Sequence, residues 1–478
     1  MRVCRHVPKF FALAFAASTA PALAQSAPFF NAPPPAPSYV YVPAPAPAQS
    51  PTLGRWAPRD LRGQGVRPSS VYAPDESDRT RRAILRSWRP LRLTRRSHAH
   101  ITGVAGDRAA SFTPETAALT RRAADRYARI VDAGGWPKVP TALRPGSRGQ
   151  AVATLRRRLA IEGDLNSPRA RESYDYAADS ERWDSKLTAA VKRFQARVGL
   201  PQSGVVAGAT LAALNVPARM RLRQLQATAN RLAAVNFRGA RRYVAVNIPS
   251  ESVQAVQNGE VVHRYIAVVG SPEHHSPQIA VQAQAINLNP TWTVPASIIK
   301  NEIIPKMRKD PGYLSHERIR VLDYQGHEIN AHAVDWNSDE ALHYILRQDS
   351  GPHDALGRLR IDMPNNQAVY MHDTNERWLF KSAYRFKSHG CVRVKDVYGL
   401  ATWLLQGTPG APYGRWDQRA IEAGIANGEQ RAIKLANPVP VIWVYMTGWA
   451  DADGVVHFRN DVYGKDSGAQ NMVHAALR

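Results

Sequence analysis

The sequence predicts an α+β protein of several domains, in which helical segments precede a mainly β domain that carries a helical insertion. Apolar residues recur with helical spacing between residues 113 and 232, and from residue 241 they alternate as they do in strands. A chain of 478 residues is long enough for two or three domains. The elements below follow from these patterns.

Residues 1–24 have the pattern of a secretory signal peptide. Three basic residues precede an Ala- and Phe-rich apolar run that ends in Ala22-Leu23-Ala24. The alternative is a retained membrane anchor, but the run is short for a bilayer span of about 20 residues and contains a proline. We therefore expect an exported protein with no transmembrane segment after signal cleavage.

The two cysteines of the chain have different expected fates. Cys4 would leave with the signal peptide, so Cys391 would be alone in a compartment where cysteines normally form disulfides. An unpaired thiol in such a place is either buried and inert or kept for chemistry.

The chain is strongly basic, with a formal net charge of +24. Such a charge favours anionic partners, and export makes cell-wall carboxylates and anionic lipids better partners than nucleic acid. Residues 25–108 form a predicted disordered linker, which is first rich in Pro and Ala and then rich in Arg. Its Arg-rich part is either a basic arm that binds an anionic envelope surface or a solvated linker.

The helical part divides into three segments. Residues 109–140 are predicted to be a helical scaffold that begins near Thr113, and residues 217–240 supply a second scaffold helix. Between them, residues 141–216 contain three short amphipathic helices separated by glycine turns, which is the pattern of a small bundle.

The mainly β domain is predicted at residues 241–448, followed by a C-terminal extension at 449–478. Alternating Val and Ile residues on both sides of Asn258-Gly259 indicate strands joined by a tight turn. Residues 297–350 have a helical pattern instead and are predicted to be an insertion that forms a lid.

The densest group of reactive side chains lies between residues 370 and 393 of this domain. It contains Tyr370-Met371-His372-Asp373 and then Ser388-His389-Gly390-Cys391-Val392-Arg393. A thiol becomes a good nucleophile when an imidazole accepts its proton, and backbone N–H groups beside a glycine can stabilise an oxyanion. A lone His in a strand is more often structural than catalytic, so composition alone leaves both interpretations open.

Residues 141–216 resemble the type 1 peptidoglycan-binding domain. The positions that match its pattern are Leu143, Gly146, Gly149, Val152, Ala190, Val191, Phe194, Gln195, Gly199 and Leu200. The acidic-glycine turn that usually precedes its second helix is replaced by YDYAADSERW. Glycan binding and a purely architectural role therefore both stay open for this domain.

The segment SHGCVR at 388–393 resembles the signature of the L,D-transpeptidase (YkuD) catalytic domain, with His372 at the spacing of the family's upstream histidine. Segments 289–298, 347–357 and 438–466 are similar to the large periplasmic, YcbB-like branch of that family. That branch combines a catalytic domain, an inserted lid and a peptidoglycan-binding domain, so the resemblance implies a periplasmic cell-wall enzyme.

The resemblance implies a role for each matching residue. Cys391 is the expected nucleophile, His372 the general base, and the backbone carbonyl of Asp373 the group that orients His372. The backbone N–H groups of Gly390 and Cys391, with the Tyr370 hydroxyl, are expected to form the oxyanion site.

Four further positions have less specific expectations. His389 and Arg393 are expected to shape the pocket, and Trp292 and Ser388 are candidate substrate contacts, although Trp292 could equally be a core residue. Many smaller members of the family have Asn where this chain has Arg393, and Asp354 stands where Asn is usual in the large branch.

The implied reaction is peptidoglycan cross-linking by a cysteine acyltransferase that acts on tetrapeptide stems and releases the terminal D-alanine. The alternatives are an L,D-carboxypeptidase that hydrolyses the same bond and a non-catalytic wall-binding scaffold. No metal and no organic cofactor is implied, and the acyl acceptor is not specified by the sequence.

Overall fold

The computed structural model describes residues 108–165 and 180–466. The predicted signal peptide and almost all of the predicted linker lie outside the described residues. All described residues belong to one compact unit of the chain, Ala73–Arg478.

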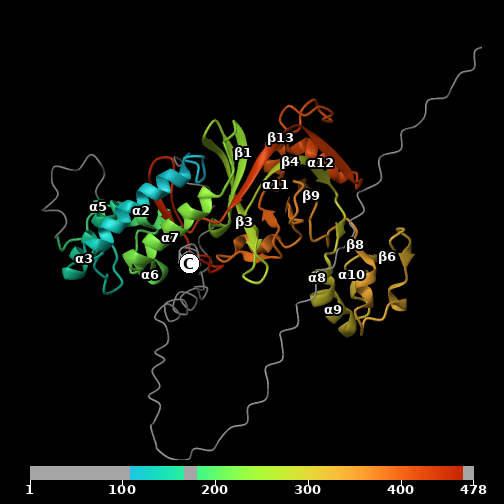
Figure 1. The fold of residues 1–478 in the computed structure, drawn as a ribbon, viewed down its shortest axis with the longest axis horizontal. Helices are drawn as coiled ribbons and strands as arrows, with labels where there is room; N and C mark the ends of the chain where they lie inside the picture. Colours follow the sequence, from blue (N-terminus) through green and yellow to red (C-terminus); the bar gives the residue numbers. More distant parts are fainter. Residues whose placement is uncertain (1–107, 166–179, 467–478) are drawn as a thin grey trace, which may run out of the picture. The chain divides into compact units, whose positions relative to one another are not determined.

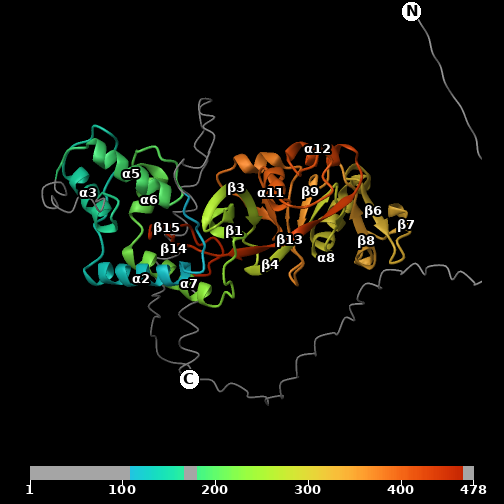
Figure 2. The same ribbon diagram turned by 90° about the horizontal axis from the view of Figure 1, so that it is seen from above.

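Two long helices pack against each other in the helical part, α2 (Thr116–Asp132) and α7 (Ala218–Ala233) (Figures 1 and 2). The buried side of α2 follows the helical period, with Thr116, Thr120, Ala123, Ala124 and Tyr127 in one stripe. These small side chains and a single tyrosine let the two helices approach closely. The described helix begins close to the start that the capping pattern at Thr113 predicts.

Among the described residues between these two helices, three shorter ones occur: α3 (Gln150–Glu162), α5 (Ser185–Arg197) and α6 (Gly208–Leu214). Asp184 caps α5 by accepting a hydrogen bond from the Leu187 N–H, and Gly163 ends α3 in a left-handed conformation. Their shared apolar core includes Leu155, Leu187 and Phe194. The described helices follow the order that the sequence pattern predicts.

The β part is a 9-stranded sheet in the order β11-β3-β12-β10-β9-β4-β13-β1-β2. Because β3 also pairs with β2, the sheet closes on itself and β11 is added beside β3. Closure removes exposed strand edges. The strands are β1 (Arg242–Asn247), β2 (Ser252–Gln257), β3 (Glu260–Gly270), β4 (Ile279–Leu288), β9 (Leu359–Asp362), β10 (Met371–His372), β11 (Phe386–Ser388), β12 (Val392–Val394) and β13 (Arg431–Val444).

The largest apolar core of the described residues joins this sheet to two helices, α11 (Val397–Leu404) and α12 (Gln418–Ala426). These helices lie side by side near β4 (Figure 2). Met371, Val392 and Val394 point into this core from the two strands that precede and follow the reactive segment. The core therefore fixes the strands from which the reactive side chains project on the opposite side.

The insertion is only partly helical, which corrects the prediction of a helical lid. Its first half contains α8 (Ala296–Ile298), a π-helical turn η3 (Ile299–Ile303), α9 (Ile304–Lys309) and α10 (Tyr313–His316). Its second half completes a 4-stranded sheet of β5 (Trp292–Thr293), β8 (Ile345–Gln348), β6 (Ile319–Leu322) and β7 (Glu328–Ile329). Figure 2 shows β6, β7 and β8 together.

The physical reason for the difference lies in strand pairing across the insertion. Ile345 and Leu346 follow a 3-10 turn, η5 (Glu340–His343), and their backbone pairs with Val321 and Leu322 of β6 rather than continuing a helix. The insertion has a separate apolar core, to which Ile299, Ile303 and Leu346 contribute. A tertiary pairing thus overrides a short helical pattern.

The C-terminal extension forms a hairpin, β14 (Gly448–Ala450) and β15 (Val456–Phe458). It contacts α2 and α7, and Phe458 packs in the same core as Tyr127 and Leu225. The extension is therefore part of the helical scaffold in space, although the sheet separates the two in sequence.

Candidate active site

Tyr370, His372, Cys391 and Arg393 project from one face of the sheet. β10 and β12 are parallel, with Met371 paired to Val392 and His372 paired to Arg393. Met371 and Val392 point into the core, so the alternating residues of both segments point to the other face. Because adjacent strands lie about 4.8 Å apart, Tyr370 and His372 of one segment and the two residues Cys391 and Arg393 of the other form one cluster.

His372 is deeply buried on this face, with only 4% of its surface exposed. Burial lowers its pKa to about 3, and the nearby Arg393 guanidinium acts in the same direction. Backbone groups of Asp373 and Leu356 lie close enough to the ring to raise its pKa in part. His372 Nδ1 itself is buried and has no hydrogen-bond partner among the described residues. The imidazole is therefore neutral in the resting site.

Cys391 is half-buried and free, and it directly precedes β12. Burial raises the pKa of its thiol to about 11. A backbone hydrogen bond from Tyr370 and the charges of Arg393 and Arg360 act in the opposite direction, because they stabilise a thiolate. The resting pair is thus a neutral thiol and a neutral imidazole.

The Tyr370 ring lies beside His372, with ring centroids 5.6 Å apart. Arg360 of β9 lies over the same ring at 5.4 Å. Burial holds the pKa of the Tyr370 hydroxyl well above its ordinary value, and a contact with Trp292 lowers it slightly. The hydroxyl therefore stays protonated and can donate a hydrogen bond. Trp292 belongs to β5, is partly buried and also packs against the apolar core of the insertion.

The turn before Cys391 depends on a glycine. Gly390 has φ +114°, a conformation that side chains rarely adopt. Its N–H donates to Ser388 Oγ at 3.2 Å, and Ser388 Oγ donates to the Cys391 carbonyl at 2.6 Å. The expected oxyanion role of the Gly390 N–H is therefore modified, because this donor already has an acceptor. Ser388 closes the turn and is buried.

Asp373 and Arg393 face neighbouring charges. Asp373 Oδ2 accepts from the Arg358 N–H at 3.1 Å and pairs with Arg377 at 3.1 Å. Arg393 pairs with Glu376 and also donates to Thr374 Oγ1 at 3.3 Å. The guanidinium of Arg393 is thereby held beside the cluster.

His389 contacts the insertion. Its Nε2 lies 2.6 Å from Glu302 Oε1, and Glu302 belongs to the π-helical turn η3. The His274 ring lies on the other side, with centroids 4.5 Å apart. Sequence reasoning missed Glu302, because nothing in the order of residues indicates that this turn reaches the catalytic loop. A π-helical turn is itself a frequent sign of a functional position.

Two more residues support the Gly390 turn from a distance in sequence. Ser276 Oγ donates to the Gly390 carbonyl at 2.7 Å and accepts from the Gly270 N–H at 2.9 Å. The Tyr463 hydroxyl accepts from the Ser276 N–H at 3.2 Å and donates to the Gly270 carbonyl at 2.7 Å. Gly270 is required here, since a Cβ would lie 2.2 Å from the His274 carbonyl oxygen. The GSPEHHS segment was the only signal in the sequence for this support.

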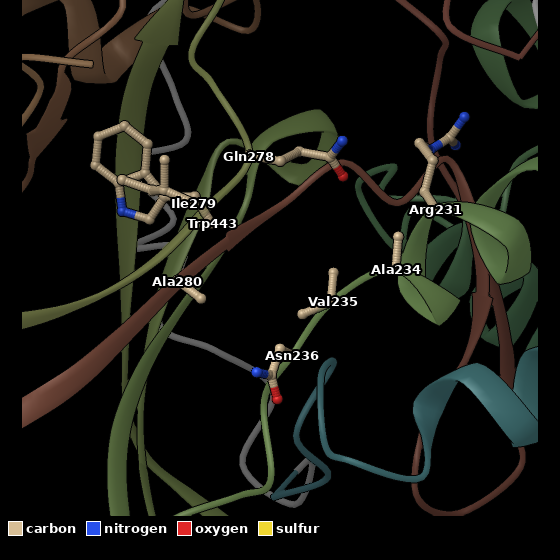
Figure 3. A pocket seen from close by; sticks show the side chains of 8 residues that line it. All are labelled: Arg231, Ala234, Val235, Asn236, Gln278, Ile279, Ala280 and Trp443. Carbon is tan, nitrogen blue, oxygen red and sulfur yellow. The ribbon is translucent and has the colours of Figure 1, made fainter. Parts of the chain in front are cut away.

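A cavity of about 250 Å³ lies elsewhere, between the end of α7, the start of β4 and β13 (Figure 3). It is lined by Arg231, Ala234, Val235, Asn236, Gln278, Ile279, Ala280 and Trp443. None of these residues belongs to the cluster around Cys391, so this cavity does not mark the chemistry. Among the described residues, no group of three or more His, Cys, Asp or Glu side chains is arranged to hold a metal ion.

The sheet and the cluster define a class of protein: a closed β-domain that presents a cysteine and a buried neutral histidine on one face. Comparison with known families places the domain more closely. Residues 241–411 match the family described as "L,D-transpeptidase catalytic domain", and residues 148–214 match that described as "Putative peptidoglycan binding domain". The chain therefore contains one region that matches the L,D-transpeptidase (YkuD) catalytic domain and another that matches a peptidoglycan-binding domain.

A curated protein of Haemophilus influenzae, described as "Putative L,D-transpeptidase", is 31% identical over 224 residues. The match covers 47% of this chain and 44% of that protein, so the chain matches less than half the length of this relative.

Solved structures give weaker likenesses. An L,D-transpeptidase from Mycobacterium smegmatis aligns with 43% of this chain and 59% of its own, at 16% identity and a TM-score of 0.21. An L,D-transpeptidase from Stackebrandtia nassauensis aligns with 55% of this chain and 87% of its own, at 14% identity and a TM-score of 0.21. Scores at this level carry no argument, and the assignment rests on the two domain matches. In the part of the chain that the structure describes, no helix is long and apolar enough to cross a membrane.

Proposed function

We propose that this protein is a periplasmic L,D-transpeptidase that cross-links peptidoglycan through a thioester on Cys391. The observation that supports this most directly is the shared face of β10 and β12, on which Cys391, His372 and Tyr370 lie together. The substrate is the tetrapeptide stem, and the first product is its terminal D-alanine.

In the first half-reaction, the Cys391 sulfur attacks the carbonyl carbon between the third residue of the stem and D-alanine. The thiol proton passes to His372, which is neutral because its pKa is far below 7. The oxyanion accepts hydrogen bonds from the Cys391 N–H and the Tyr370 hydroxyl, with the Gly390 N–H available once it leaves Ser388. When the C–N bond breaks, His372 returns the proton to the departing amine and a thioester is left.

In the second half-reaction, an amine replaces D-alanine. The side-chain amine of a third-position diamino acid on a neighbouring stem attacks the thioester and gives a proton to His372. The new amide bond forms, and the sulfur leaves and takes the proton back. His372 serves as base and then as acid in both halves, and atoms and charges balance without a cofactor.

For cross-linking, the thioester must react with an amine before water hydrolyses it. The insertion at 297–350 supports this, because Glu302 bonds to His389, two residues from Cys391. Trp292, at the start of the insertion's sheet, contacts Tyr370 in the same site. A covered site with an oriented amine disfavours hydrolysis. The L,D-carboxypeptidase reaction is the outcome expected if the cover does not exclude water.

The test is mass spectrometry of muropeptides after the purified full chain is incubated with wall sacculi rich in tetrapeptide stems. Cross-linked products and free D-alanine are expected in matching amounts. D-alanine with uncross-linked tripeptides would identify the protein as a carboxypeptidase. If neither D-alanine nor cross-links form, the remaining interpretation is a non-catalytic wall-binding scaffold.

A further inference from the structure

A buried aspartate lies in the connection that returns from the insertion to the catalytic sheet. This connection joins the last strand of the insertion, β8, to β9 and includes Asp354. Asp354 is 0% exposed, and its backbone is fixed at both ends by bonds with Gly351 and Gly357. A fully buried carboxyl group without a full set of partners requires an explanation.

The two carboxyl oxygens of Asp354 have different surroundings. Oδ1 accepts from the Leu356 N–H at 2.9 Å, whereas Oδ2 is buried without a hydrogen-bond partner among the described residues. Burial raises the pKa of this carboxyl to about 7, and the charge of Asp373 also raises it. The charges of Arg358 and Arg360 lower the pKa of Asp354. Tyr370, which directly precedes β10, lies near the same carboxyl group.

The same connection holds the general base in place. The Leu356 backbone lies against the His372 ring, and the Arg358 N–H donates to Asp373 Oδ2 at 3.1 Å. Gly357 packs so closely that a Cβ there would lie 2.6 Å from the Asp373 side chain. Backbone groups of both Asp373 and Leu356 act on the ring, and His372 Nδ1 has no hydrogen-bond partner among the described residues.

We infer that Asp354 is a positioning residue for His372: its carboxylate holds the Leu356 N–H, and the Leu356 backbone orients the imidazole. The inference rests on the proposed role of His372 as the base. The connection also touches the insertion, because Gln348 Nε2 donates to the Glu317 and His353 carbonyls at 3.0 and 3.1 Å. Asp354 therefore lies in the connection that contacts both the insertion and His372.

The charge of Asp354 gives this positioning a dependence on pH. When Asp354 ionises, its bond to the Leu356 N–H becomes charge-assisted and stronger. The Leu356 backbone is then held more firmly, so its carbonyl is better placed to accept a hydrogen bond from a ring N–H of His372 and to stabilise the imidazolium that forms as Cys391 loses its proton. Base assistance should thus increase as the pH rises through about 7.

The test measures the alkylation rate of Cys391 by iodoacetamide from pH 5.5 to pH 9, in the full chain with Cys4→Ser. The variants are Asp354→Asn, which keeps the shape and removes the charge, and Asp354→Ala, which also removes the bond to Leu356. The matched control is Glu251→Gln, another buried carboxyl whose pKa is raised to about 7 and whose partner is Arg385.

The expected rate ratio of the parent to Asp354→Asn is near one at pH 5.5. It should rise to about tenfold at pH 8.5, as one charge-assisted hydrogen bond allows, with a midpoint near 7. Asp354→Ala should be slower at every pH, and Glu251→Gln should keep a constant ratio. A constant ratio for Asp354→Asn in a variant that melts like the parent would overturn the inference.

Alkylation reports on the thiol and imidazole whether or not the protein transfers stem peptides. A pH-dependent ratio without D-alanine release would keep the role of Asp354 and reject the proposed transpeptidase. D-alanine release together with a constant ratio would reject the role of Asp354 and keep the proposed transpeptidase.

Discussion

At the scale of single residues, burial keeps Cys391 and His372 neutral, with pKa values of about 11 and 3. A neutral pair costs little to bury, whereas a buried thiolate and imidazolium would need solvation that this face does not supply. In the mechanism that we propose, the charge forms during attack on the substrate, when Arg393, Arg360 and the backbone of Tyr370 stabilise it. This arrangement also protects an unpaired thiol from oxidation between turnovers.

Replacing the nucleophile should abolish both half-reactions. Cys391→Ser is expected to lose D-alanine release and cross-linking together, because His372 activates a hydroxyl far less readily than a thiol. The melting curve should match the parent, since the two side chains differ little in size. Cross-linking near the parent rate would remove Cys391 from its proposed role.

Removing the base should have a pH-dependent effect. His372→Ala is expected to lower D-alanine release by at least about two orders of magnitude at pH 7. Activity should partly recover as the pH approaches the Cys391 pKa of about 11, because thiolate then forms without a base. Unchanged activity at pH 7 would point to another base, and His389 is the first residue to test.

The pKa of His372 also predicts the acid limit of stability. The imidazole has a folded pKa of about 3 and an ordinary value near 6.5, so the unfolded chain binds a proton first as the pH falls. This group's contribution to stability is therefore present above about pH 6.5 and is lost progressively towards pH 3. Melting curves of the parent and His372→Gln should converge as the pH is lowered, and a constant difference would contradict the shift.

At the scale of elements, segments far apart in sequence support the catalytic turn. The π-helical turn η3 supplies Glu302 to His389, and the C-terminal segment supplies Tyr463 to Ser276 and Gly270. Pro305 follows η3 and has no N–H for an α-helical bond, which favours the wider turn there. The catalytic turn is thus held from the insertion and from the end of the described chain.

Breaking the contact between the insertion and the catalytic loop should change the products more than the first half-reaction. Glu302→Gln is expected to lower the ratio of cross-links to hydrolysed tripeptides, because a loosened cover admits water to the thioester. Lys300→Gln is the matched control, since its partner Asp339 lies within the insertion. Muropeptide ratios measure both, and an unaltered ratio for a folded Glu302→Gln protein would mean that this contact does not exclude water.

Removing one hydroxyl from the C-terminal segment should weaken the turn. Tyr463→Phe loses the bonds to Ser276 and Gly270, which costs about 1–3 kcal/mol of unfolding free energy. D-alanine release should fall as well, because Ser276 no longer fixes the Gly390 carbonyl. Tyr413→Phe, at a tyrosine that is 54% exposed, is the control expected to change neither quantity. A parent-like melting curve for Tyr463→Phe would show that Ser276 holds the turn without it.

At the scale of the whole molecule, the charge of +24 is the dominant property. Inside the described part, many basic residues are already used in ion pairs, such as Arg158 and Arg197 with the buried Glu162. The predicted linker at 25–108 adds further Arg clusters by sequence. This distribution suggests that envelope association and catalysis depend on different parts of the chain.

Removing residues 25–108 should leave turnover of soluble substrate unchanged and weaken association with isolated envelopes. Attraction by exposed charge is screened within about 8 Å at physiological ionic strength, so the lost component should be the salt-sensitive one. Co-sedimentation at low and high salt measures it. A truncated protein that fails to fold would mean that the segment belongs to the folded core.

The sequence by itself determined the order of the helical and β parts, the three helices of the small domain and the reactive segment around Cys391. These follow from local periodicity and from residue types whose chemistry is specific, so they need no knowledge of distant contacts. The sequence did not determine the second half of the insertion, because β8 forms only by pairing with β6. Nor did it indicate Glu302, Tyr463 or the role that we infer for Asp354, since each depends on contacts with residues that are distant in the sequence. Only the tertiary structure decides such contacts, because burial and hydrogen bonding depend on which surfaces the closed sheet brings together.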